Sequence, residues 1–184
     1  MIPQRWLILC SAMCSAGLLW SAVLIAALLA GVRLVPTAVA VAVAAVLTVP
    51  GVIAGVLGNR WLYRTTRPRV RWNLTSWVPP HVPHWAGVLA GVFFFGFWLT
   101  VVVAFAGLDG DIQMRGGQYV RSDDGRTAVV SQADFDRHRN LEQQISLGVL
   151  GAAAVGGVFM TGAILTHHAA PQPTETQSAG QALA

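Results

Sequence analysis

The sequence has little charge, and what it has is unevenly placed. Only 11% of the 184 residues are charged, and Asp, Glu, Lys, Arg and His are missing from four long stretches: residues 6–31, 36–58, 85–107 and 145–166. Each stretch can cross a hydrocarbon core, for which a helix needs roughly 20 residues. Because a backbone in lipid must satisfy its own hydrogen bonds, each stretch is expected to be a helix. The sequence therefore predicts an all-α membrane protein with four transmembrane helices.

The four stretches also lack the groups that membrane chemistry usually needs. Pumps, transporters and membrane-embedded enzymes tend to keep ionisable side chains inside the bilayer. Signatures of serine hydrolases, P-loop proteins, dinucleotide-binding folds, zinc proteases and EF-hands are missing from the whole sequence. These absences predict a non-enzymatic protein without a cofactor.

Cysteine is scarce and lysine is absent, so all 12 basic residues are arginines. The two cysteines, Cys10 and Cys14, are spaced i,i+4 within the first stretch and do not suit disulfide geometry. We interpret them as packing residues. The first stretch is too long for the apolar region of a signal peptide and is expected to remain as a helix.

The four predicted helices and the segments that connect them form a single domain, residues 1–168. The segment 108–144 contains strand-prone runs on either side of Asp123-Asp124-Gly125, which is typical of a β-hairpin. Ser131 followed by Asp134 predicts a capped helix start, and that helix is expected to run from near Gln132 into the last span. The segment is thus predicted to be a small extramembrane hairpin docked on a helical extension. Residues 169–184 form a polar tail that is predicted to be disordered.

Small residues predict where the helices approach one another. Gly51 and Gly55 form one G-x-x-x-G pattern and Gly87 and Gly91 form another, while the last span is rich in glycine and alanine. Such stripes allow close helix packing, within one chain or between chains. Pro50 is expected to kink the second helix.

The connection 59–84 mixes arginine with aromatic residues and contains no acid. Both types of side chain favour the headgroup layer of a membrane, and clustered arginines favour the anionic cytoplasmic leaflet. We therefore expect both termini and this loop in the cytoplasm, segment 108–144 outside, and no nucleic-acid partner. The residues predicted to contact lipid headgroups are Arg60, Trp61, Arg64, Arg67, Arg69, Arg71, Trp72 and Trp77.

Histidines provide one further candidate site. His81 and His84 precede the third span, and His167 and His168 end the fourth, so four spans would bring them to one membrane face. Imidazole binds zinc, copper and haem iron well. Metal or haem binding is a lesser hypothesis, because interfacial histidines at helix ends also explain the pattern.

The leading functional hypothesis is an accessory protein that contacts a partner, or itself, through segment 108–144. The alternative is a subunit of an oligomeric channel or transporter, whose pore would be lined by hydroxyls. The arrangement resembles small bacterial membrane proteins with a hairpin-and-helix insert before the last span, which implies a bacterial inner membrane but no particular function. The apolar strip predicted for partner contact comprises Tyr119, Val120, Val129, Val130 and Phe135, and the candidate pore hydroxyls are Ser11, Ser15, Ser21, Thr48, Thr100 and Thr161.

Overall fold

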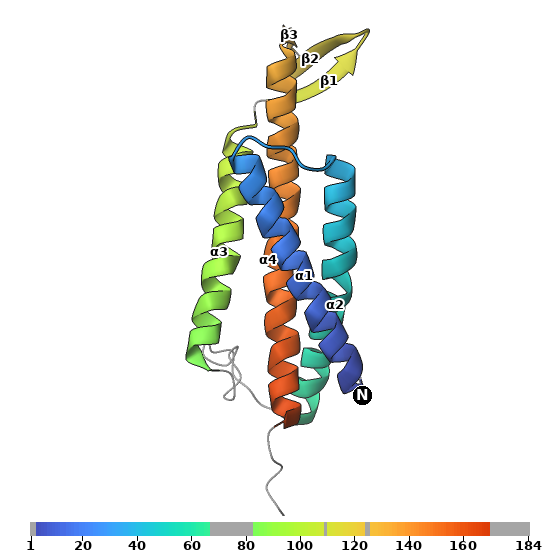
Figure 1. The fold of residues 1–184 in the computed structure, drawn as a ribbon, viewed down its shortest axis with the longest axis vertical. Coiled ribbons are helices and arrows are strands. Elements are labelled where there is room, and N and C mark those ends of the chain that lie inside the picture. Colours follow the sequence, from blue (N-terminus) through green and yellow to red (C-terminus); the bar gives the residue numbers. More distant parts are fainter. Residues whose placement is uncertain (1–2, 67–82, 109, 124–125, 170–184) are drawn as a thin grey trace, which may run out of the picture.

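A computed structural model describes residues 3–66, 83–108, 110–123 and 126–169. Within them lie four helices and one small sheet (Figure 1). All four helices are long and apolar enough to cross a membrane, as the sequence predicted. The elements in chain order are α1 (Gln4–Leu29), α2 (Thr37–Thr66), α3 (His84–Ala106), β1 (Asp111–Arg115), β2 (Gln118–Asp123), β3 (Arg126–Val130) and α4 (Gln132–Ala169).

Helix α4 is the centre of the bundle. It packs against α1, α2 and α3, whereas α3 packs mainly against α4 alone. Figure 1 shows α2 and α3 on opposite sides of α4, whose N-terminal part extends beyond the other helices and carries the sheet beside it. The start of α1, the start of α3 and the end of α4 lie at the opposite end of the bundle.

Helices α1 and α2 form an antiparallel hairpin joined by a short turn. α1 ends in a Schellman motif, in which the Val32 N–H donates to Ala27 O at 2.8 Å and the Gly31 N–H donates to Leu28 O at 3.0 Å. Gly31 has a φ of 78°, a backbone conformation that residues with a Cβ rarely adopt. The turn therefore sets where α1 stops and directs the chain back along the bundle.

Helix α2 is longer than the sequence predicted. The expected span ended at residue 58 and a loop was expected from residue 59, but the helix continues to Thr66. The chain has neither Gly nor Pro between Gly58 and Pro68, so nothing ends the helix earlier. Pro50 lies inside α2, as expected from its position. The predicted disordered tail, apart from Ala169, lies outside the described residues.

The closest helix packing surrounds the Cys14 thiol. A Cβ added at Gly51 would overlap Cys14 Sγ and lie 2.8 Å from Cys10 O, and one added at Gly157 would lie 2.7 Å from the same sulfur. Cys14 is fully buried, and its thiol donates a hydrogen bond to Thr48 O at 3.3 Å. Helices α1, α2 and α4 therefore meet at a point where only glycine leaves room for the sulfur.

Other glycines confirm that small residues form the seams of the bundle. A Cβ at Gly55 would lie 2.9 Å from Met160 Cβ, and one at Gly148 would lie 3.2 Å from Phe97 O. Gly87 and Gly91 differ, because a Cβ at either would meet no atom within 4 Å. The second G-x-x-x-G pattern is therefore not an internal seam.

The predicted hairpin is confirmed, but it belongs to a three-stranded sheet of order β1-β2-β3. β2 and β3 pair antiparallel from Tyr119 opposite Val130 to Asp123 opposite Arg126. β1 was not predicted, and it pairs with β2 through a two-residue turn at Gly116-Gly117. Both glycines have positive φ, 58° and 81°, as a tight hairpin turn of this type requires.

The junction at Cys14 generates a stability prediction. Gly51→Ala places a methyl group against Cys14 Sγ and the Cys10 carbonyl, and overpacking of this kind typically costs about 1–3 kcal/mol. The thermal unfolding midpoint of the purified protein in detergent should therefore fall. Gly91→Ala is the matched control, since its Cβ meets nothing within 4 Å and its midpoint should not fall. Equal midpoints for the two variants would contradict the tight junction.

Candidate functional site

The polar part of the structure is concentrated at one end of the bundle. It consists of the sheet together with residues 132–144 of α4, and we call this unit the platform. Helix α4 starts in it with a reciprocal cap: the Asp134 N–H donates to Ser131 Oγ at 3.2 Å, and the Ser131 N–H donates to Asp134 Oδ2 at 3.2 Å. The Ser131 hydroxyl also donates to Asp134 Oδ2 at 2.7 Å. This confirms the predicted helix start, because the two residues cap the N-terminus of α4 reciprocally.

An aromatic pair attaches the sheet to the helix. The rings of Tyr119 on β2 and Phe135 on α4 stack with centroids 4.6 Å apart and an interplanar angle of 24°. The Arg139 guanidinium lies 5.4 Å from the centroid of the Phe135 ring, a distance at which cation–π attraction operates. The hairpin therefore docks on the helical extension, as the sequence predicted.

A second set of contacts attaches the helix to the α1–α2 turn. Gln143 is only 1% exposed, and its Nε2 donates to Val35 O at 3.4 Å. Its Oε1 accepts a hydrogen bond from Thr37 Oγ1 at 3.3 Å, and Arg33 Nη2 donates to that same threonine oxygen at 2.7 Å. The buried amide thus satisfies its polar atoms while bridging the platform to the bundle.

His138 and Arg139 both pair with Glu142 within the platform. His138 is 7% exposed, with its Nε2 3.5 Å from Glu142 Oε1, one helical turn away. The Arg139 Nη1 lies 3.4 Å from Glu142 Oε2. Sequence reasoning missed both His138 and Gln143, because polar residues in a projecting helix are normally assigned to solvent.

The apolar strip predicted for partner contact does not form one surface. Neighbouring residues of a strand point to opposite faces of the sheet, so Tyr119 and Val130, a register pair, lie on the face that meets Phe135. Val120 and Val129 form the next register pair and lie on the opposite face. Of the five residues, three belong to the attachment of the sheet to α4, and only the Val120–Val129 pair faces outward.

This outward face is mixed in character. Val129 is 67% exposed, and its register neighbours across the sheet are Val120 and Gln113. The side chain of Gln113 donates to Asp111 Oδ2 at 2.6 Å along the outer strand. The outward face therefore has a small apolar centre flanked by polar side chains.

The other predicted site residues are only partly described. His84 begins α3 and His167 and His168 lie in the last turn of α4, at the same end of the bundle, as expected (Figure 1). No group of three His, Cys, Asp or Glu side chains suited to a metal occurs within the part of the chain that the structure describes. Arg60, Trp61 and Arg64 lie on α2 rather than in a loop, and Arg60 is exposed. His81, Arg67, Arg69, Arg71, Trp72 and Trp77 lie outside the described residues.

The hydroxyls considered for a pore are mostly used in packing. Ser21, Thr48 and Thr161 are each at most 1% exposed, and they lie between helices. Thr161 donates to Gly157 O at 2.7 Å on its own helix, and Thr100 donates to Gly96 O at 3.0 Å on its own. The buried hydroxyls of Ser21 and Thr48, in contrast, have no hydrogen-bond partner among the described residues.

Comparison with known proteins adds no family to this geometry. No protein-family model, no curated protein and no solved structure matches the chain.

The helix cap predicts a dependence on pH. Hydrogen bonds from the Ser131 hydroxyl, and then from its backbone N–H, hold the pKa of Asp134 below its ordinary value. The stabilisation is fully present above the pKa of an unfolded aspartate, about 3.9, and is lost as the pH falls through the lower pKa of the folded state. Ser131→Ala should raise the pKa of Asp134, as followed by NMR of its carboxyl carbon, while Ser131→Thr should keep it low. An unchanged titration in Ser131→Ala would contradict the cap.

Proposed function

We propose that the protein is a non-enzymatic integral membrane protein of a bacterial inner membrane that binds a partner protein through its platform. Both termini lie in the cytoplasm, and the platform lies outside. The partner would contact the outward sheet face around Val120 and Val129. The segments that support this proposal are four apolar helices and one compact polar unit at a single end of the bundle.

The length of α4 is the observation that carries the proposal. It has 38 residues, and at 1.5 Å per residue it is about 57 Å long. A hydrocarbon core is roughly 30 Å thick, so nearly half of the helix must lie outside it. The acids and arginines of α4 all precede residue 145. The projecting part is therefore the N-terminal one, with the sheet attached.

Defined contacts order the platform. The Tyr119–Phe135 stack joins the sheet to α4, while the Ser131–Asp134 cap and the bridge from Gln143 to the α1–α2 turn hold the start of α4. A surface that is already ordered loses less conformational entropy when a partner binds. The platform would thus bind without first having to fold.

The orientation is argued from charge. Arg60, Arg64, Arg67, Arg69 and Arg71 follow the second apolar stretch within 13 residues, whereas the five arginines of 108–144 are spread over 37 residues. Arginines close to the spans favour the cytoplasmic side. Their density therefore supports a cytoplasmic 59–84 and a platform outside.

Thiol labelling tests this topology. In intact cells, a membrane-impermeant maleimide should label Val129→Cys, and it should label Arg60→Cys only after permeabilisation. The parent chain is the control, because Cys10 and Cys14 lie within the apolar part of α1 and should stay unlabelled in both conditions. The reverse pattern of labelling would show the opposite orientation.

Site-directed photocrosslinking tests the docking role. A photoreactive phenylalanine derivative in place of Val129 should yield an adduct with one protein of defined mass. The same residue in place of Val103, which is 64% exposed on α3, should not. Phe135→Ala, combined with the probe at position 129, should reduce the yield severalfold because the sheet loses its stacking partner.

Two results would contradict the docking role. Adducts only between copies of this chain would favour the oligomeric channel instead. An equal loss of yield in Phe105→Ala, whose ring is 70% exposed on α3, would mean that the effect of Phe135→Ala is not specific to the platform.

A further inference from the structure

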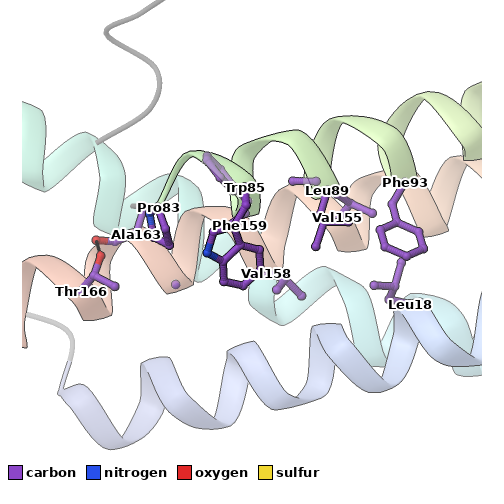
Figure 2. A pocket seen from close by; sticks show the side chains of 13 residues that line it. Leu18, Pro83, Trp85, Leu89, Phe93, Val155, Val158, Phe159, Ala163 and Thr166 are labelled. Carbon is purple, nitrogen blue, oxygen red and sulfur yellow. Dashed lines mark hydrogen bonds between the residues drawn. The ribbon is translucent and has the colours of Figure 1, made fainter. Parts of the chain in front are cut away.

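An apolar groove lies between α3 and α4, at the end of the bundle opposite the platform. Its volume is about 330 Å³, and Figure 2 shows side chains from both helices, with Leu18 of α1, directed into it. Val155 and Ala163 are nearly buried, at 6% and 7% exposure, and line its floor. Its outer wall includes Trp85, Leu89 and Phe93, whose exposed fractions lie between 47% and 66%.

The groove exists because α3 is held firmly at one end only. The Phe97 ring would overlap a Cβ at Gly151, so the two helices touch closely there. Toward the start of α3, Figure 1 shows the two helices diverging. A Cβ at Gly162, which lines the groove, would meet no atom within 4 Å. Among the residues that the structure describes, no side chain fills this space.

Its chemistry is that of a hydrocarbon site. Thr166 is the one lining residue with a polar side chain apart from the indole N–H of Trp85, and its hydroxyl donates to Ala163 O at 2.9 Å. The groove thus presents carbon along its length. An apolar ligand bound in the groove would therefore not break the hydrogen bond of the Thr166 hydroxyl.

Its length matches one leaflet of a bilayer. The α4 side runs from Val155 to Thr166, and eleven residue steps at 1.5 Å span about 16 Å. Half of a hydrocarbon core is roughly 15 Å. A single extended acyl chain would therefore fit from the membrane surface to the midplane.

Two exposed arginines lie at the same level of the bundle as the Thr166 end of the groove, on the side of α4 that faces α2. Gly157 of α4 meets Cys14 of α1, and the two helices are antiparallel. Arg5 precedes Cys14 by nine residues and Thr166 follows Gly157 by nine, so the two residues lie at the same level of the bundle. Gly58 meets Ile164, and this places Arg60 at the same level. Both arginines are exposed, and the acids of 109–142 lie at the far end of the bundle. An anionic headgroup would be attracted to this end.

We infer that this groove binds one acyl chain of an anionic phospholipid, with the lipid phosphate at the level of Arg5 and Arg60. The inference rests on the proposed membrane placement but not on the proposed partner. The site is independent of the platform, from which it is separated by the length of the bundle. A helix from a second copy is the competing occupant, which the test must distinguish.

The test uses phosphatidylglycerol with a diazirine on one acyl chain, in vesicles that contain the purified full-length protein. After irradiation, mass spectrometry should find lipid adducts in segments 83–93 and 155–166. Gly162→Leu fills the groove without a backbone clash and should reduce these adducts at least fivefold. Gly156→Leu is the matched control, since it lies on the same helix, has equally open space at its Cβ and does not line the groove.

The headgroup is tested with a phosphatidylcholine probe that carries the same acyl chain. The parent chain should be labelled less by this probe than by phosphatidylglycerol, and Arg60→Gln should reduce the difference. Equal labelling of the parent by both probes would overturn the anionic preference.

Three outcomes would contradict the groove as a lipid site or distinguish its failure from a failure of membrane placement. Equal labelling of the parent and Gly162→Leu would overturn the groove as the site. A photoreactive phenylalanine derivative in place of Leu89 that crosslinks to a second copy would assign the groove to an oligomer contact. Protein that stays with the vesicles after an alkaline wash but shows no adducts in either segment would overturn the groove alone and leave membrane placement standing.

Discussion

The position of α4 depends on one tightly packed point, the Cys14 thiol between Gly51 and Gly157. Between helices in lipid there is little hydrophobic driving force, so close packing and hydrogen bonds must hold a bundle together. Here both coincide, because the sulfur fills the space that two glycines leave and its proton is donated to Thr48 O. α1, α2 and α4 are locked by this contact. Since α4 continues unbroken into the platform, the same contact fixes the platform relative to the bundle.

The sequence predicted what depends on periodicity and local chemistry. The four spans, the cap at Ser131 and the hairpin around Asp123 follow from apolar length, capping and turn residues, and all three are present. The missed strand β1 had a signal of the same kind, the Gly116-Gly117 turn next to strand-prone residues. α2 was predicted too short because a change in polarity at residue 59 was interpreted as a helix end. A helix in fact ends where the backbone cannot continue, and polarity alone does not stop it.

The candidate sites were harder to predict because they depend on which face a residue occupies. Tyr119 and Val120 are adjacent in sequence yet serve opposite faces of the sheet, one for attachment to α4 and one for exposure. Gln143 resembles any surface glutamine in the sequence, and only the approach of the α1–α2 turn buries it. Glycine patterns were equally ambiguous: Gly51 is a packing contact, whereas Gly91 has open space at its Cβ. Such distinctions arise from tertiary packing, which no local pattern encodes.

The two ends of the molecule differ because α3 is attached differently from the other helices. It lies outside the Cys14 junction, and it meets α4 closely only near Gly148 and Gly151, toward the platform end. Below that contact its large side chains stay exposed and the groove opens. Above it, α3 ends before Gly107, where an added Cβ would lie 3.4 Å from the Leu141 side chain on α4.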